Sequence, residues 1–530
     1  MKSISLVIIA LFCSIIINAQ TKGSISGWIV NKNTQTPIAG VTVKVLNTSF
    51  STVSDSLGRY QLTNIPTGQY QVIFTSLGSI PYTLYNVVVS SGNETINTIE
   101  LLPQEVTLKE VLVGGNRKTV RAATLETPLS VQKLTAEEIK SSPGSNFDIS
   151  KVVQTLPGVT GSASTSAGFR NDIIVRGGAP NENVFYLDGI EIPVINHFST
   201  QGSAGGPQGI LNVSFIDEVK LSTSAFDAKF DNALSSVFEF KQKRGNTDKT
   251  QGNIRLSATE MAATLEGPLS ASGKTTYLLS ARRSYLQFLF EALDLPIRPN
   301  YWDFQYKVTH QIDPKTTITL LGLGAIDDFY FAAPKKATPE KIYALNAGPS
   351  INQWNYTFGA SLKKLINKGF WNLSISRNQL NNINERYQNN LGPDKGEKTL
   401  DYTSNESGNH LRWDLTKTVA GWKCTTGVNI ESINYSNNTY QLLRYNSLTN
   451  LGGVNTLTNP LSIQYQNQIV FTKYGGFVQI GKKAFNNRLG ISGGIRMDGN
   501  SFTKDGNAIE KRISPRMSLS YVLNLSLIHI

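Results

Sequence analysis

Polar and apolar residues alternate along much of the second half of the chain. Trp302, Phe304, Tyr306 and Val308 alternate with polar neighbours, and the same period of two returns in several later stretches. Successive side chains of a β-strand point to opposite faces, so this period predicts strands with one apolar and one polar face. Each stretch runs about ten residues or more, which is enough for a tilted strand to cross a bilayer.

The connections between these predicted strands alternate in length. Short turns are predicted at 313–315, 367–369, 420–421 and 485–487, and long polar stretches at 332–350, 386–405 and 441–461. Short turns at one end and long loops at the other are typical of a transmembrane β-barrel. A large soluble sandwich also alternates, but the regular strand lengths and aromatic strand ends favour the membrane. We count about twelve strands after residue 250.

Two smaller regions precede this pattern. Between residues 22 and 102, short alternating runs are interrupted by turn residues at spacings of about 8 to 12, which predicts a β-sandwich. Between residues 126 and 247 the signals are mixed. Asp148 is a candidate cap for a helix over 149–156, which Pro157-Gly158 would end. Short strands are predicted at 172–176, 183–187, 219–221 and 236–240, so this region is expected to be an α+β domain.

The first residues have the pattern of an export signal. Lys2 precedes a mostly apolar run from Ile4 to Ile17, and Ala19 offers a cleavage site, so residues 1–19 are predicted to be a signal peptide. The run is too short to serve as a membrane anchor. Export excludes cytosolic enzymes, and removal of the signal would leave Cys424 as the one cysteine, so no disulfide framework is expected.

Composition agrees with a folded β protein. The chain has 530 residues, of which 40% are hydrophobic and 17% charged, which excludes a disordered chain and a coiled coil. The net charge is +12, but lysine and arginine are scattered. We therefore favour a basic surface facing anionic lipid or glycan over a nucleic-acid partner.

The sequence contains a match to one enzyme motif, but the secondary structure predicted around it is not the one that the motif requires. Gly490–Gly494 fits G-x-S-x-G, but the serine lies in an alternating strand and not at a strand–turn–helix elbow. The four histidines are far apart and lack zinc-site spacing. No catalytic residue, metal site or cofactor is predicted.

Two parts of the chain resemble known families. Residues 22–102 resemble the carboxypeptidase-regulatory-like domain, an accessory sandwich, and residues 119–245 resemble the plug of TonB-dependent outer-membrane receptors. The first resemblance is carried by Gly27, Pro37–Val41, Asp55–Tyr60 and Ile65–Tyr70. The second is carried, in this order, by Thr127–Val131, Leu156–Val159, Ile174–Gly178, Val184–Ile190 and Ile216–Val219. The whole chain resembles the Bacteroidetes-type receptors of this family.

The resemblance implies an order of domains and a mostly β fold. It predicts a signal peptide at 1–19, a β-sandwich at 20–102, a linker at 103–125, a plug at 126–247 and an incomplete antiparallel transmembrane β-barrel at 248–530. The barrel of such a receptor has 22 strands, and its wide lumen needs a folded plug. The alternating pattern accounts for about twelve of these 22 strands. We therefore expect the sequence to be a C-terminally truncated fragment.

The resemblance also suggests site residues. Lys109, Glu110, Val111, Leu112 and Val113 form a β-prone run in the linker, and we predict that they contact TonB by adding a strand to its sheet. A plain linker is the alternative.

Other site residues are expected within the plug. Gly177, Gly178 and Gly189 would permit tight turns beside Asp188, and Arg176 would be buried against a barrel carboxylate, with Glu260 and Glu266 nearest in sequence. A solvated arginine at a strand end is the alternative for Arg176. Ligand contacts are predicted at the plug apices, at Phe169, Arg170, Asn171, His197 and Phe198.

The function implied is that of a TonB-dependent receptor in the outer membrane of a Gram-negative bacterium, with its N-terminal domain in the periplasm. It would bind a scarce nutrient and import it with energy from the inner membrane. The expected partners are TonB, outer-membrane lipid, a small-molecule, glycan or metal-chelate substrate, and a surface lipoprotein. The alternative is a surface adhesin or glycan-binding protein anchored by the barrel.

Overall fold

The computed structural model shows a mostly β chain that divides into two compact units, residues 1–112 and 113–530. The residues described are 22–89, 94–103, 131–135, 138–139, 148–161, 172–199, 205–223, 226–257, 259–390, 396–444, 447–451, 454–458, 460–485 and 489–521. The predicted signal peptide and most of the predicted linker lie outside these residues, and the domain boundaries stay predictions. Within the described part of the chain, no helix is long and apolar enough to cross a membrane.

The first unit consists of two small sheets that enclose one core. One sheet has the order β4 (Arg59–Pro66), β1 (Lys22–Asn31), β7 (Glu94–Leu101). The other has the order β3 (Ser51–Val53), β2 (Thr42–Val45), β5 (Gly68–Thr75), β6 (Tyr82–Val89). Alternate residues of both sheets, such as Ile25 and Phe74, are buried in one cluster. This is the packing that the alternating runs predict for a sandwich.

The second unit begins with the α+β domain, which is built around a five-stranded sheet. Its order is β12 (Ile190–Glu191), β11 (Asn183–Leu187), β14 (Ser236–Gln242), β13 (Ile216–Ser222), β8 (Val131–Thr135). A two-stranded sheet of β9 (Val159–Gly161) and β10 (Ile173–Val175), and two 3-10 turns, η1 (Pro180–Glu182) and η2 (Val213–Phe215), accompany it. Asp148 caps helix α3 (Ile149–Val153) as predicted, accepting from the Ser150 N–H at 2.9 Å. The helix ends at Val153, earlier than the predicted residue 156.

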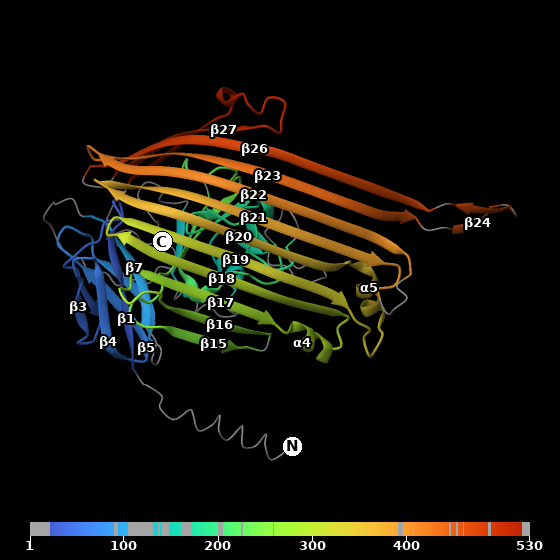
Figure 1. Cartoon of the computed structure of the whole chain (residues 1–530), viewed down its shortest axis with the longest axis horizontal. Helices are drawn as coiled ribbons and strands as arrows, with labels where there is room; N and C mark the ends of the chain where they lie inside the picture. The colour runs from blue at the N-terminus through green and yellow to red at the C-terminus, as the bar shows by residue number, and fades with distance from the viewer. Residues whose placement is uncertain are drawn as a thin grey trace, which may run out of the picture. The chain divides into compact units, whose positions relative to one another are not determined.

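A twelve-stranded antiparallel sheet, here called the wall, follows and confirms the strand count (Figure 1). Its strands lie in chain order, and within the described residues the edge strands β15 and β28 do not pair with each other. They are β15 (Gln251–Leu256), β16 (Glu260–Pro268), β17 (Thr275–Ser284), β18 (Ile297–Asp313), β19 (Thr316–Phe331), β20 (Ser350–Ile366), β21 (Gly369–Tyr387), β22 (Lys398–Val419), β23 (Trp422–Arg444), β26 (Leu461–Ala484), β27 (Leu489–Asn500) and β28 (Ile513–Tyr521).

The two ends of the wall differ as the sequence predicts. At one end the connections are short, and two residues separate β18 from β19, β20 from β21 and β22 from β23. Ala420 and Gly421, for example, both have positive φ, as a type I′ turn requires. At the other end the connections are longer and carry helices α4 (Leu286–Ala292) and α5 (Pro339–Ala347), the hairpin β24 (Ser447–Leu451)–β25 (Val454–Thr458) and the 3-10 turn η3 (Ile509–Lys511). Figure 1 shows α4, α5 and β24 gathered at that end.

The wall has its apolar side chains on the outside. Trp302 and Phe304 are 41% and 45% exposed, whereas Asp303 and Gln305 between them are each 1% exposed. The polar face is buried because the α+β domain packs against it, and Leu321 of the wall joins the hydrophobic core of that domain. A soluble sheet turns its apolar face inward, so the reversed polarity is that of a transmembrane barrel strand.

Candidate functional site

His197 of the α+β domain lies between aspartates of two neighbouring wall strands. Its Nδ1 is 2.6 Å from Asp327 Oδ1 on β19, and its Nε2 is 3.0 Å from Asp303 Oδ2 on β18. All three side chains are buried. The imidazole stacks on Tyr301 with ring centroids 3.8 Å apart, and the backbone N–H of Phe198 donates to Asp327 Oδ2 at 2.8 Å.

This geometry fixes the charge of the His197 ring. An ionised carboxylate only accepts hydrogen bonds, so both ring nitrogens must donate, which requires the imidazolium. Burial lowers the pKa of the His197 imidazole, but Asp327 and Asp303 outweigh burial and raise it above its usual value. His197 is therefore a buried cation held by two carboxylates.

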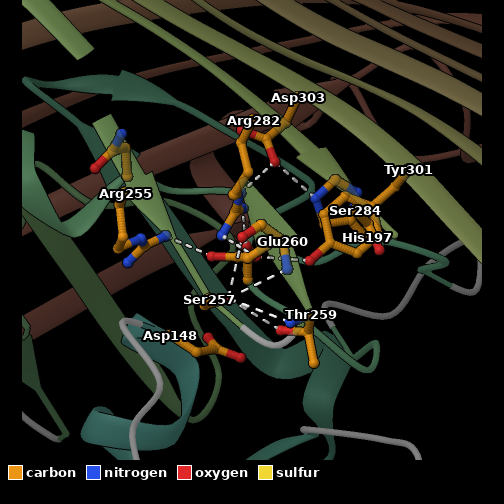
Figure 2. Close-up of polar contacts among 12 residues, drawn as sticks. Asp148, His197, Arg255, Ser257, Thr259, Glu260, Arg282, Ser284, Tyr301 and Asp303 are labelled. Atoms are coloured by element: carbon orange, nitrogen blue, oxygen red, sulfur yellow. Dashed lines mark hydrogen bonds and ion pairs between the residues drawn. The ribbon is translucent and has the colours of Figure 1, made fainter. Parts of the chain in front are cut away.

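Arg282 on β17 extends the same group of contacts (Figure 2). Its Nε donates to Asp303 Oδ2 at 2.6 Å, one terminal nitrogen lies 3.5 Å from Glu260 Oε2, and the other donates to the main-chain oxygen of Gly209 in the α+β domain. Glu260 on β16 also accepts from the Tyr301 hydroxyl at 2.9 Å and pairs with Arg255 on β15. Five adjacent wall strands, β15 to β19, are thus joined by one ionic network.

A second group of contacts holds the segment 226–233 of the α+β domain. Here three wall arginines donate to main-chain oxygens, and one of them, Arg496, also pairs with the Asp231 carboxylate of that segment at 3.5 Å. Arg412 bonds Lys229 at 2.6 Å, Arg516 bonds Asp227 at 2.7 Å, and Arg496 bonds Ala228 at 3.3 Å. The alternating pattern predicts the polar inner face for these arginines, but nothing in the sequence identifies backbone oxygens as their partners.

A cavity of about 220 Å³ lies beside this segment, between the α+β domain and the wall. The side chains around it combine carboxylates, cations, amides and aromatic rings. The rings of Phe471 and Phe502 have centroids 5.2 Å apart. The cavity is lined by Asp231, Asn232, Asn429, Phe471, Lys473, Tyr474, Asp498, Gly499, Asn500, Phe502, Thr503 and Arg512.

The expectation of a buried Arg176 is wrong. Arg176 follows strand β10, has φ of 50° and is exposed, as in the alternative of a strand-end arginine. Glu260 pairs instead with Arg255 and Arg282, and Glu266 pairs with Lys243 at 2.7 Å.

The glycines and Asp188 lie in tight turns. Gly177 and Gly189 have φ of 80° and 85°, and a side chain on Gly178 would meet Ser235 and Glu182. Asp188 accepts from the backbone N–H of Gln242 at 2.9 Å and pairs with Lys307 Nζ on β18 at 2.9 Å. Asp188 is therefore a contact between the α+β domain and the wall.

The other predicted site residues divide into two groups. The segment Lys109–Val113 and the residues Phe169, Arg170 and Asn171 lie outside the described residues. His197 is fully buried and Phe198 partly buried against the wall, so His197 presents no surface to a ligand in this structure, and the ligand contacts at these residues stay a prediction. In the part of the chain that is described, no three His, Cys, Asp or Glu side chains are arranged to hold a metal ion.

Comparison with known proteins places these features among receptors. Residues 25–113 match the CarboxypepD_reg-like domain, and residues 123–237 match the TonB-dependent Receptor Plug Domain. The chain is 22% identical over 254 residues to the TonB-dependent transporter Oar of Myxococcus xanthus, an alignment that covers 46% of this chain and 22% of that protein. The chain thus spans about a fifth of this relative.

Solved receptor structures share the fold. The ferric enterobactin receptor of Pseudomonas aeruginosa matches with a TM-score of 0.51 and 15% identity, over 76% of this chain and 61% of the receptor. The outer membrane transporter YddB of Escherichia coli matches with a TM-score of 0.52 and 15% identity, over 74% of this chain and 59% of the transporter. The α+β domain is hence called the plug. By sequence the chain is similar to a TonB-dependent transporter, and by fold to outer-membrane receptors.

Proposed function

We propose that this chain acts as a TonB-dependent receptor of the outer membrane, which binds a scarce nutrient outside and imports it into the periplasm. The observation that carries the proposal is the pairing of a plug-like domain with the polar face of a sheet whose apolar face is exposed. Apolar residues such as Trp302 and Phe304 on that outer face suit contact with lipid hydrocarbon. A protein with this architecture needs no covalent chemistry to move a solute.

The contacts between plug and wall suit a domain that must move. Side chains such as His197, Arg282 and Arg412 hold the plug by hydrogen bonds and ion pairs. Water in a lumen can replace such bonds when the plug shifts, at a lower cost than exposing an apolar interface of equal area. This polarity supports transport over a rigid anchor.

The cavity beside Asp231 is the proposed ligand site. It is formed jointly by plug and wall, so a bound ligand would contact the element that has to move. Its aromatic rings and charged groups suit a small polar molecule, a glycan or a metal chelate. Receptors of similar fold include one that was solved with enterobactin, which makes a ferric catecholate the first chelate to test.

Energy would enter through the linker. We place the TonB contact at Lys109–Val113, which precedes the plug match at residue 123. An extended peptide can add a strand to the edge of a partner's sheet, with main-chain hydrogen bonds supplying the affinity. A pull on this peptide would act on β8, the first plug strand within the described residues.

Accumulation with and without TonB tests the proposal. Cells that produce the full-length protein are given labelled ferric enterobactin and labelled oligosaccharides, and bound and internalised label are separated. We expect internalised label for one probe class in cells with TonB, and surface-bound label alone in cells without TonB. Surface binding with no TonB-dependent entry for either class would contradict transport and support the adhesin.

A further inference from the structure

His197 joins the plug to neighbouring wall strands through charged groups. Through Asp303 it contacts β18, through Asp327 it contacts β19, and Arg282 connects it to β17. No role for this residue follows from the plug match itself. A neutral histidine in a protein core donates one hydrogen bond and accepts another. Both ring nitrogens of His197 instead face hydrogen-bond acceptors, which distinguishes it from such a histidine.

The charge balance of the surrounding group depends on the His197 proton. Three cationic side chains, His197, Arg282 and Arg255, are joined to three carboxylates, Asp303, Asp327 and Glu260. Loss of the proton would leave one excess negative charge in a buried site. Buried uncompensated charge is costly, so the neutral ring destabilises this arrangement.

The two aspartates would respond differently to a neutral ring. Asp303 keeps Arg282 as a charge partner, but its Oδ1 is buried and accepts no hydrogen bond within the described residues. Asp327 accepts from His197 and from the Phe198 N–H. A neutral imidazole has one N–H, so it can donate to one aspartate and must turn a lone pair toward the other. Either choice breaks the bridge across β18 and β19.

Other groups face the site from the packed elements. Tyr301 on β18 stacks on the imidazole and donates to Glu260 on β16. Arg255 on β15 neutralises the other oxygen of Glu260. On the plug side, Asp148 is fully buried near Gly209, and burial raises the pKa of its carboxyl. None of these groups donates a hydrogen bond to Asp327, so none of them can take the place of the His197 ring.

We propose that His197 is a positioning residue for transport, which latches the plug to β18 and β19 as an imidazolium and releases it when the ring loses its proton. The gating role rests on the proposed function, whereas the latch is a property of the fold. The sign follows from the raised pKa of His197. The latch is fully present below the unperturbed pKa of histidine, about 6.5, and is lost as pH rises through the raised value.

Hydrogen exchange of the full-length protein in outer-membrane vesicles tests the latch. Exchange of the peptide around 196–199 is followed from acid to alkaline pH and corrected for the intrinsic pH dependence of exchange. We expect wild-type protein to show a step to faster exchange at alkaline pH. His197→Gln should exchange about tenfold faster at acid pH, the loss of one charged hydrogen bond, and should show no step. An unchanged step in His197→Gln would overturn the latch.

Two further variants keep the test sharp. Asp327→Asn preserves shape but removes one of the two charges that stabilise the imidazolium, so the step should move to lower pH; a step that stays in place would overturn the latch. His310→Gln is the matched control, because His310 is exposed and bonds Thr275, and it should retain the wild-type profile. Loss of the step in His310→Gln would assign the pH-dependent rise in exchange to a group other than His197.

Conductance in planar bilayers separates the latch from gating. Release of the plug opens an ion path, so openings of wild-type protein should become more frequent above the exchange step, and those of His197→Gln should be frequent throughout. An exchange step without a conductance change would retain the latch and overturn its gating role. Failure of the proposed function would appear independently, as the absence of TonB-dependent accumulation.

Discussion

Lys307 Nζ lies 2.9 Å from Asp188 Oδ2, and this ion pair joins wall strand β18 to the turn that follows plug strand β11. Both side chains are largely buried, and Lys307 also donates to the main-chain oxygens of Gln242 and Lys243 at 3.1 and 3.2 Å. One lysine therefore contacts two segments of the plug that are far apart in sequence.

Removal of this lysine charge is expected to loosen the plug. Lys307→Met leaves Asp188 without its cation and should lower the free energy of plug unfolding by about 3 kcal/mol. The urea midpoint for protease cleavage of the plug measures the change. Lys315→Met, at an exposed turn of the same wall, is the control and should leave the midpoint unchanged. Equal midpoints for the two variants would contradict the pairing.

The arginine contacts with segment 226–233 make a second prediction. Arg496 is 1% exposed and bonds Ala228, Asn429 and Asp498 through different nitrogens. Arg496→Lys keeps the charge but cannot reproduce this fork, so exchange of residues 226–233 should rise by about tenfold or more. Arg377→Lys, which alters an exposed arginine, should leave that exchange unaltered. Slow exchange in Arg496→Lys would show that charge alone holds the segment.

Membrane contact of the outer face is tested by a lysine placed at two depths. Phe304→Lys puts a charge near the middle of β18 on the exposed apolar face and should cost about 2–4 kcal/mol of insertion free energy. His310→Lys, on the same face near the strand end, should cost about 0–1 kcal/mol. Folding into lipid vesicles under urea measures both. Equal effects of the two lysines would argue against a bilayer around this face.

The TonB segment is tested by a single proline. Val111→Pro removes a backbone donor and blocks strand addition, so energised uptake should be abolished while ligand binding is retained. Val106→Pro, which lies earlier in the same linker, is the control for a general effect of proline. The measurement is accumulated against surface-bound label in cells with TonB. Unchanged accumulation in Val111→Pro would remove this segment from the TonB contact.

The N-terminal unit carries its own acid-sensitive turn. Burial raises the pKa of the Asp55 carboxyl, but hydrogen bonds from Arg59 and Leu57 outweigh it and hold the pKa below its usual value. The contribution of Asp55 to stability is therefore present above about pH 4 and lost as pH falls through the lowered pKa.

Asp55→Asn tests this turn in the full chain. The substitution should destabilise residues 51–62 by about 0.5–1 kcal/mol at neutral pH, because the side chains are partly exposed. Hydrogen exchange of that peptide against pH is the measurement, and the difference from wild type should vanish in acid. Asp505→Asn, at an exposed residue of the other unit, should change nothing there. A difference that persists in acid would contradict the carboxylate's role.

The sequence by itself determined the strands of the wall and their two faces. Period-two alternation places Trp302 outside and Asp303 inside, because adjacent side chains of a strand must point in opposite directions. Local turn chemistry likewise predicts the tight turn at Ala420-Gly421 and the cap at Asp148. Each of these features depends on residues within a few positions of one another, which is the range over which sequence patterns carry information.

Only the tertiary structure decided which inward-facing groups meet. His197 is 130 residues from Asp327 and 106 from Asp303, and no local pattern specifies which wall residues lie opposite a plug turn. For the same reason Arg176 was expected to be buried against the wall but lies exposed. Arg282 and Arg496 bind backbone oxygens of the plug, and a backbone oxygen leaves no signal in the amino-acid sequence. Strand faces are set by backbone geometry, whereas partners across an interface are set by the packing of whole domains.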